Sequence, residues 1–219
     1  MKPAVYNPQP TTIIPQKRNQ LQPAMPVFKL KDLCPNICVG LSDEALADGL
    51  RPHMGNIARD FLLDLQDTST LISDPNIIPS GLRFPFLLIE TKSGATGGNL
   101  YQAQNQAAVS GSSAVQILRN LLDLQEIQES HRRNSPAGYD DSELTELNLA
   151  FSITTEGPIH ELWLYLRRSC DDEFYMVCMG SWRVTNDDAS RNFLLHVAAV
   201  LRWGHGKLKN SIVSTLKDL

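Results

Sequence analysis

Two charged side chains, Glu90 and Lys92, end an apolar run in the middle of the chain. The run extends from Phe84 to Ile89, and Glu90, Thr91 and Lys92 follow at once. Residues two apart on a β-strand lie on the same face, so the carboxylate and the ammonium would emerge together beside a dry core. A carboxylate there can bind Mg²⁺, which prefers oxygen ligands, and a lysine can position water or stabilise charge on a phosphate. The spacing therefore predicts a site for metal-assisted hydrolysis.

The order of the surrounding residues adds to this weak signal. A Glu-x-Lys pair is expected about once by chance in a chain of this size. Here an aspartate, Asp74, precedes the strand, and the segment after it carries Gln102 and Gln106 at helical spacing. A metal site needs a second carboxylate, and Asp74 is the nearest upstream candidate. An aspartate before a proline is equally typical of a turn, so both interpretations of Asp74 stay open.

The elements that must position these residues are predicted from capping and periodicity. Ser42 is a favourable N-cap for a helix that is interrupted near 49–52, and a second helix over about 53–66 turns Ile57, Phe61 and Leu65 towards a core. A short strand or strand start is expected at 71–78. The strand at 84–92 is apolar on both faces and should be central in a sheet. A helix then begins near residue 100, with a break at the small residues 110–114 and a solvent loop over about 129–145.

The last third of the chain changes to strand periodicity. Segments 148–155, 159–168 and 174–184 are separated by short turn sequences and predict an antiparallel meander. Asn186 then caps a helix with an apolar stripe through Phe193, Val197 and Val200, which ends at Gly204 in the position of a C-terminal cap. A final helical segment reaches Leu219. The predicted fold is an α/β (α+β) domain in which helices flank a sheet.

Composition limits the organisation of the chain. With 219 residues, 42% of them hydrophobic and 20% charged, the sequence predicts one domain over 27–219. Residues 1–26 hold six prolines and are interpreted as a flexible arm, which could also bind a protein partner. No apolar stretch is long enough to span a bilayer, and four cysteines are too few for a disulfide scaffold. An intracellular location, nuclear or cytoplasmic, is therefore expected.

The segment from Leu82 to Gln106 resembles a known family. Its Leu82–Lys92 strand, the Gly97-Gly98 pair and the glutamine-rich stretch Tyr101–Gln106 are similar to fungal PD-(D/E)XK nuclease-like proteins. The resemblance is strongest over about 74–110 and continues as an order of elements to about 204. It implies a restriction-endonuclease-like core, with a helix, three mostly antiparallel strands, a helix and a further strand, in a mixed, mostly antiparallel sheet. It also implies a Mg²⁺- or Mn²⁺-dependent nuclease that hydrolyses phosphodiester bonds, in DNA.

The resemblance also implies roles for individual residues. Asp74 and Glu90 would bind the divalent metal, with the backbone carbonyl of Thr91 as a third ligand. Lys92 would be the catalytic lysine, and Gln106 would reach the site from the helix, with Gln102 as its substitute. Such nucleases often add an acidic residue from the first helix. For that role the sequence offers a choice of three: Glu44, Asp60 and Asp64.

A second hypothesis places the chain in a different functional class. It is a catalytically silent module of the same fold that binds protein or nucleic acid. The formal net charge of −4 favours it, because affinity for phosphate comes mainly from clustered Lys and Arg. So does the order Asp74-Pro75, which reverses the Pro-Asp order of the nuclease motif. The intact pair of Glu90 and Lys92 favours the enzyme.

Overall fold

The computed structural model describes residues 35–68, 70–73, 81–133, 146–168 and 173–219. Two strands and two helices precede the long central helix, in the order β1 (Ile37–Ser42), α1 (Asp43–Met54), α2 (Ala58–Asp67), β2 (Leu82–Lys92) and α3 (Leu100–Arg133). Three strands and two helices follow it, namely β3 (Leu149–Glu156), β4 (Ile159–Arg167), β5 (Phe174–Arg183), α4 (Asp187–Trp203) and α5 (Lys209–Asp218). The predicted arm at 1–26 lies outside the described residues. The predicted strand at 71–78 does not form at 71–73, and its remainder is also outside.

The strands form one mixed sheet in the order β1-β2-β3-β4-β5. All neighbouring pairs are antiparallel except β2 and β3, which are parallel. The predicted central strand and the predicted meander of β3, β4 and β5 are both confirmed. The short strand β1 falls in a stretch with no clear periodicity, and the sequence did not predict it. Between β1 and β2 lie α1 and α2, so two described strands rather than three precede α3.

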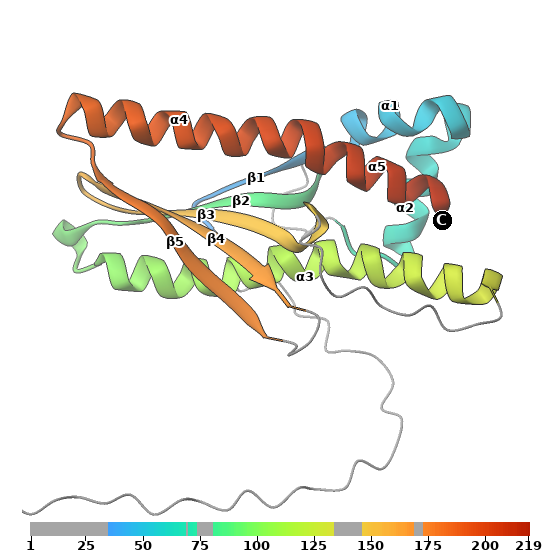
Figure 1. Cartoon of the computed structure of the whole chain (residues 1–219), viewed down its shortest axis with the longest axis horizontal. Helices are drawn as coiled ribbons and strands as arrows, with labels where there is room; N and C mark the ends of the chain where they lie inside the picture. Colours follow the sequence, from blue (N-terminus) through green and yellow to red (C-terminus); the bar gives the residue numbers. More distant parts are fainter. Residues whose placement is uncertain (1–34, 69, 74–80, 134–145, 169–172) are drawn as a thin grey trace, which may run out of the picture.

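Helices cover both faces of the sheet (Figure 1). The long helix α3 lies along one face, in the connection that leads from the end of β2 back to the start of its parallel neighbour β3. Such parallel neighbours need a long crossover, because a tight turn cannot return the chain to the same end of the sheet. On the other face lies α4, and α5 extends beyond it and packs against α1. None of the described helices is long and apolar enough to cross a membrane.

The predicted break in α3 at residues 110–114 is wrong, because the helix is continuous. Its small residues instead allow the helix to approach the sheet closely. A Cβ atom added at Gly111 would lie 2.6 Å from ring atoms of Tyr165 on β4. Ser110 and Ala114 are buried in the same contact. A larger residue at 111 would push α3 away from the strands.

The α-helical part of α4 ends at Trp203 with Gly204 at the C-cap position, as predicted, but Gly204 does not end the helical path. The backbone of Gly204 is right-handed helical, with φ of −61°, and the chain continues through a π-helical segment (Gly204–Leu208) into α5. A Cβ atom there would lie 2.2 Å from the ring of Phe86, so this glycine allows β2 and the helix to pack closely. The interruption predicted at 49–52 falls at 55–57 instead, and Ile57 is exposed while Leu62 is buried.

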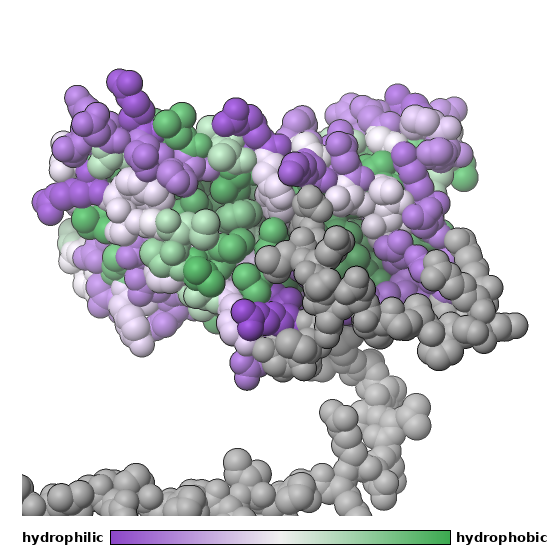
Figure 2. Space-filling view, in the orientation of Figure 1, coloured by the Kyte–Doolittle hydropathy of each residue, from purple (hydrophilic) through white to green (hydrophobic). Residues whose placement is uncertain are grey.

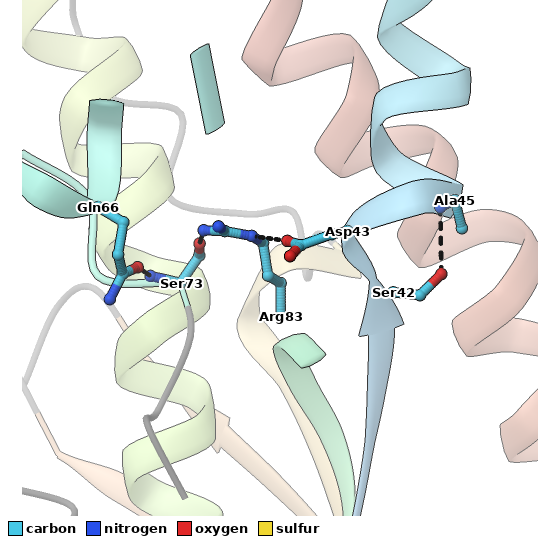
Figure 3. Close-up of polar contacts among 6 residues, drawn as sticks. All are labelled: Ser42, Asp43, Ala45, Gln66, Ser73 and Arg83. Atoms are coloured by element: carbon cyan, nitrogen blue, oxygen red, sulfur yellow. Dashed lines mark hydrogen bonds and ion pairs between the residues drawn. The ribbon is translucent and has the colours of Figure 1, made fainter. Parts of the chain in front are cut away.

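A buried polar network fixes the start of β2 (Figure 3). The Arg83 side chain, only 3% exposed, forms an ion pair with Asp43 in the first turn of α1 and donates to Ser73 Oγ at 2.7 Å. The backbone N–H of Ser73 donates to Gln66 Oε1 on α2 at 2.9 Å. Ser42 caps α1 as predicted, accepting from the N–H of Ala45 at 3.1 Å. These contacts connect β1, α1, α2 and β2 at one end of the sheet.

Replacing Arg83 should destabilise the fold strongly. Arg83→Met leaves the Asp43 carboxylate without its partner and should lower the free energy of unfolding by about 3 kcal/mol, as expected for a broken buried pair. The matched control is Arg51→Ala, which removes an ion pair with Asp48 that is more than half exposed. That control should cost less than about 1 kcal/mol. Urea unfolding of both variants gives the comparison, and equal losses would contradict a structural role for Arg83.

Candidate functional site

Glu90 lies near the end of the central strand β2, on the sheet face that α3 covers. Glu90 is 3% exposed, and its Oε1 atom accepts a hydrogen bond from Ser110 Oγ of α3 at 3.1 Å. Buried charged residues are rare unless they are paired, so this position needs a physical explanation. The apolar run before Glu90 explains why the strand is central, and the small face of α3 explains why the carboxylate is covered.

Burial raises the pKa of Glu90 above its ordinary value, because the charged form loses hydration. The hydrogen bond from Ser110 and the positive charge of Lys92 act in the opposite direction and only partly offset the burial. Lys92 follows two residues later on the same strand face and is half-buried. The structure therefore brings Glu90 and Lys92 together, as their spacing predicted.

A second carboxylate, that of Glu161, lies on the same face two strands away. Thr154 of β3 is the register partner of both Glu90 and Glu161, so the three residues form a polar row across β2, β3 and β4. The Oε2 atom of Glu161 accepts from Thr154 Oγ1 at 2.9 Å and from Gln104 Nε2 at 2.8 Å. It also accepts from Trp163 Nε1 at 3.1 Å. Sequence reasoning missed Glu161, although its alternation with Trp163 and Tyr165 in a meander strand placed it on their face.

A buried tyrosine extends this polar face. The hydroxyl of Tyr165 is 2.9 Å from Ser152 Oγ, and both residues are buried. Burial raises the pKa of Tyr165, the hydrogen bond to Ser152 lowers it, and the negative charge of Glu90 raises it further. Tyr165 therefore stays a neutral phenol at any physiological pH, beside the carboxylate of Glu90.

The start of α3 is fixed by a separate set of contacts. Asn99 Oδ1 accepts from the N–H of Gln102 at 2.9 Å, and Gln102 Oε1 accepts from the N–H of Asn99 at 3.4 Å. This reciprocal cap uses Gln102, the substitute glutamine of the sequence prediction. Glu156, the register partner of Lys92, accepts from the N–H of Leu100 at 2.7 Å. The helix that covers the site is thus anchored at its first turn to β3.

The structure treats the predicted glutamines differently. Gln106 immediately precedes buried Ala107 and has an exposed side chain. Gln104 immediately follows buried Ala103, is half-buried, and reaches Glu161. The approach of Gln106 to the polar row is therefore not observed, and Gln104 makes that contact. The catalytic role assigned to Gln106 stays a prediction.

The remaining predicted ligands are not brought together among the described residues. Asp74 lies outside them, and Ser73, the described residue before it, accepts from the N–H of Phe84 at 2.8 Å near the start of β2. Thr91 is exposed, and its N–H and hydroxyl both donate to Asn36 Oδ1, at 2.7 and 3.1 Å. The roles of Asp74 and of the Thr91 carbonyl stay predictions.

The three acidic residues offered from the first helices lie far from Glu90. Glu44 lies two residues after Ser42, which pairs with Leu82 at the start of β2. Glu90 lies eight residues further along the same strand. That separation is about 26 Å along a strand at about 3.3 Å per residue. Asp60 and Asp64 are exposed on α2, whose end is joined to the same start of β2 through Gln66. The first-helix contribution to the site is therefore not supported.

A surface hollow of about 710 Å³ lies at that same end of β2, lined by α1, the start of α2 and Gly81. Its lining includes Asp48 and Arg51, which pair with each other, and Asp43, which pairs with Arg83. It contains no part of the polar row. Size alone does not make this hollow the functional site.

The polar row suits a divalent cation in ligand type. Glu90 offers oxygen atoms, and a cation beside it would compensate the unfavourable burial of its charge. Mg²⁺ commonly uses only one or two carboxylates and keeps several waters. No group of three or more His, Cys, Asp or Glu side chains suited to a metal occurs among the described residues. The chemistry available at Glu90 therefore depends on how many further ligands join it.

Replacing Glu90 with a neutral residue should stabilise the protein most at pH values above 4.5, the ordinary pKa of a glutamate side chain. In the window above that pH, the folded state retains a proton that the unfolded chain has lost, so stability falls as pH rises towards the folded-state pKa. Glu90→Gln removes this loss of stability. The unfolding temperature of the variant should therefore exceed that of the wild type by more at pH 8 than at pH 4. Asp64→Asn, on an exposed carboxylate, is the control and should change stability little. An equal effect of Glu90→Gln at both pH values would contradict the cause assigned to the shift.

Comparison with known proteins identifies the family of the chain. A family model described as a domain of unknown function (DUF7924) matches residues 14–216. Neither the curated proteins nor the solved structures contain a match. The matched range includes all the described strands and the second half of the segment predicted as an arm. The chain therefore belongs to the DUF7924 family.

Proposed function

We propose that the chain is a metal-dependent nuclease-like hydrolase that cleaves phosphodiester bonds, with DNA as the substrate. One observation carries the proposal, namely that a buried glutamate and a lysine share a face at the end of a central strand. The energetic cost of burying the Glu90 carboxylate favours a positively charged partner beside it. A divalent cation together with Lys92 would provide that partner.

The residues have distinct roles in this proposal. Glu90 and Asp74, with the Thr91 carbonyl, would hold Mg²⁺ or Mn²⁺. When bound, such an ion supplies Lewis-acid activation of a phosphate oxygen and lowers the pKa of a bound water. Lys92 stabilises negative charge that develops on the phosphate. Ser110 orients one oxygen of Glu90, and Gln106 contacts substrate from the exposed side of α3.

Cleavage assays test this proposal directly. Plasmid and single-stranded DNA are incubated with the full chain in Mg²⁺ or Mn²⁺, and Glu90→Ala and Lys92→Ala should each reduce cleavage about 10²-fold or more. The exposed variant Asp64→Asn serves as a folded control and should keep full activity. Equal residual cleavage by the wild type and both variants would show that the activity is a contaminant.

Metal binding can be measured without any cleavage. A ligand present at about 100 times its Kd stabilises the folded state by about 2.7 kcal/mol. MnCl₂ should therefore raise the unfolding temperature of the wild-type protein and leave that of Glu90→Ala unchanged. If neither Mn²⁺ nor Mg²⁺ changes the unfolding temperature of the wild-type protein, the proposed metal site is wrong.

The two glutamines can be separated by the same assays. Gln104→Ala removes a hydrogen bond to a half-buried carboxylate and should cost about 1–2 kcal/mol in unfolding free energy. Gln106→Ala removes an exposed side chain and should lower cleavage without changing stability. If Gln106→Ala retains full cleavage, its proposed contact with substrate is wrong.

The second candidate is a catalytically silent module that binds protein or nucleic acid. The net charge of −4 favours it. So do the hydrogen bonds of Glu161, whose Oε2 atom accepts from three donors within the protein. A carboxylate satisfied in this way needs no cation. This candidate predicts binding without cleavage and no effect of divalent ions on unfolding.

A further inference from the structure

The charge of the chain is divided unevenly between its N-terminal segment, residues 1–34, and the rest. The segment lies outside the described residues, and its sequence contains one acidic residue and five basic ones, namely Lys2, Lys17, Arg18, Lys29 and Lys31. Its formal net charge is therefore +4, and since the whole chain carries −4, residues 35–219 carry −8. The modest net charge of the whole chain thus hides a basic segment joined to an acidic domain.

The described surface near Lys92 offers little positive charge for a nucleic acid. The strand register places Lys92, Glu156 and Arg183 at one end of the sheet. Two exposed aspartates, Asp187 and Asp188, begin α4 shortly after Arg183. The face that β5 presents is apolar near its middle (Figure 2). Affinity for phosphate comes mainly from clustered Lys and Arg, so a DNA substrate needs them from another part of the chain.

The N-terminal segment joins the fold beside the candidate site. Pro35, the first described residue, is buried. Asn36 Oδ1 accepts from the N–H and the hydroxyl of Thr91, at 2.7 and 3.1 Å. Thr91 lies between Glu90 and Lys92 at the end of β2. The structure therefore fixes the end of a basic segment next to the two charged residues of the proposed active site.

Covalent geometry keeps the nearest lysines of the segment close to this site. Lys31 and Lys29 precede Asn36 by five and seven residues. An extended chain spans at most about 3.6 Å per residue, so their Cα atoms lie within about 18 and 25 Å of the Asn36 Cα atom. Duplex DNA carries one negative charge per about 1.7 Å of its axis. A duplex bound at the candidate site would therefore present many phosphates within reach of both lysines.

We propose that the N-terminal segment is the phosphate-binding part of the protein, in which Lys17, Arg18, Lys29 and Lys31 contact the backbone of a DNA duplex held at the candidate site. The proposal rests on the proposed function, which supplies DNA as the partner. Phosphate contacts of this kind position a duplex without reading its sequence. DNA is favoured over the acidic domain because its charges are dense, whereas the net charge of −8 is spread over residues 35–219. The family match begins at residue 14 and so includes all four basic residues.

Binding to a fluorescent DNA duplex in EDTA tests the proposal without cleavage. A variant of the full chain in which the four residues are replaced (Lys17→Gln, Arg18→Gln, Lys29→Gln and Lys31→Gln) should bind about tenfold more weakly or worse. The plot of log K against log salt concentration should become shallower by about 2–4, because each lost phosphate contact removes about 0.9 from the slope. An affinity that is unchanged or higher would overturn the proposal, as would a wild-type protein that does not bind DNA.

A matched variant removes the same charge from the described surface. Arg59→Gln, Arg202→Gln, Lys207→Gln and Lys217→Gln change four exposed side chains on helical segments and, like the first variant, bring the net charge of the chain from −4 to −8. This variant should keep an affinity close to that of the wild type. Equal weakening by both variants would mean that only the total charge matters, and the proposal would be wrong. Circular dichroism and urea unfolding check that both variants fold.

Lysine acetylation locates the contact in the unaltered protein. A succinimidyl ester of acetic acid modifies accessible lysines, and mass spectrometry measures the rate at each one. Bound duplex should slow the modification of Lys29 and Lys31 and leave that of exposed Lys207 and Lys217 unchanged. An equal effect at all four lysines would overturn the assignment.

The nuclease proposal and this one fail in different ways. A duplex that is bound through the N-terminal segment but is not cleaved in Mg²⁺ or Mn²⁺ supports phosphate binding by the segment and contradicts the nuclease. Equal cleavage by the wild type and by the variant of the N-terminal segment, with equal affinity in EDTA, supports the nuclease and overturns phosphate binding by the segment.

Discussion

The close contact between α3 and the sheet is the constraint on which the candidate site depends. Gly111 allows the helix to approach until Tyr165 fills the space of the missing side chain, and Ser110 then lies within hydrogen-bonding distance of Glu90. The same contact removes Glu90 from water and raises its pKa. A more distant helix would leave the carboxylate hydrated and chemically ordinary. Small side chains at one turn of α3 therefore decide the electrostatics of the whole face.

The two ends of β2 solve the problem of buried charge in different ways. At the start, Arg83 is paired with Asp43 and bonded to Ser73, so its charge is neutralised within the fold. At the other end, Glu90 receives one side-chain hydrogen bond within the described part of the chain, from Ser110, and only partial compensation of its charge from Lys92. The first arrangement is a structural joint between elements. The second leaves an electrostatic deficit, and such deficits are concentrated at functional sites.

The polar row also shows how a mixed sheet collects residues from distant parts of the chain. The parallel pairing of β2 and β3 sets Glu90 beside Thr154, and the antiparallel pairing of β3 and β4 sets Thr154 beside Glu161. Glu90 is separated in sequence from Thr154 and Glu161 by the whole of α3. Their convergence needs the crossover, because a hairpin between β2 and β3 would reverse the register and face a different pair of residues.

The sequence by itself determined the strands of the sheet after β1, the cap at Ser42 and the shared face of Glu90 and Lys92. Each depends on local rules, since apolar runs, turn residues and the two-residue period of a strand act over a few positions. It could not determine the path of α3 through residues 110–114 or of the helix through Gly204, because these small residues resemble breaks and caps until a ring from another strand packs on them. Nor could it select Gln104 over Gln106, or Glu161 as the second carboxylate. Those choices depend on the register between strands and on the rotation of α3 about its axis, and only tertiary packing sets either one.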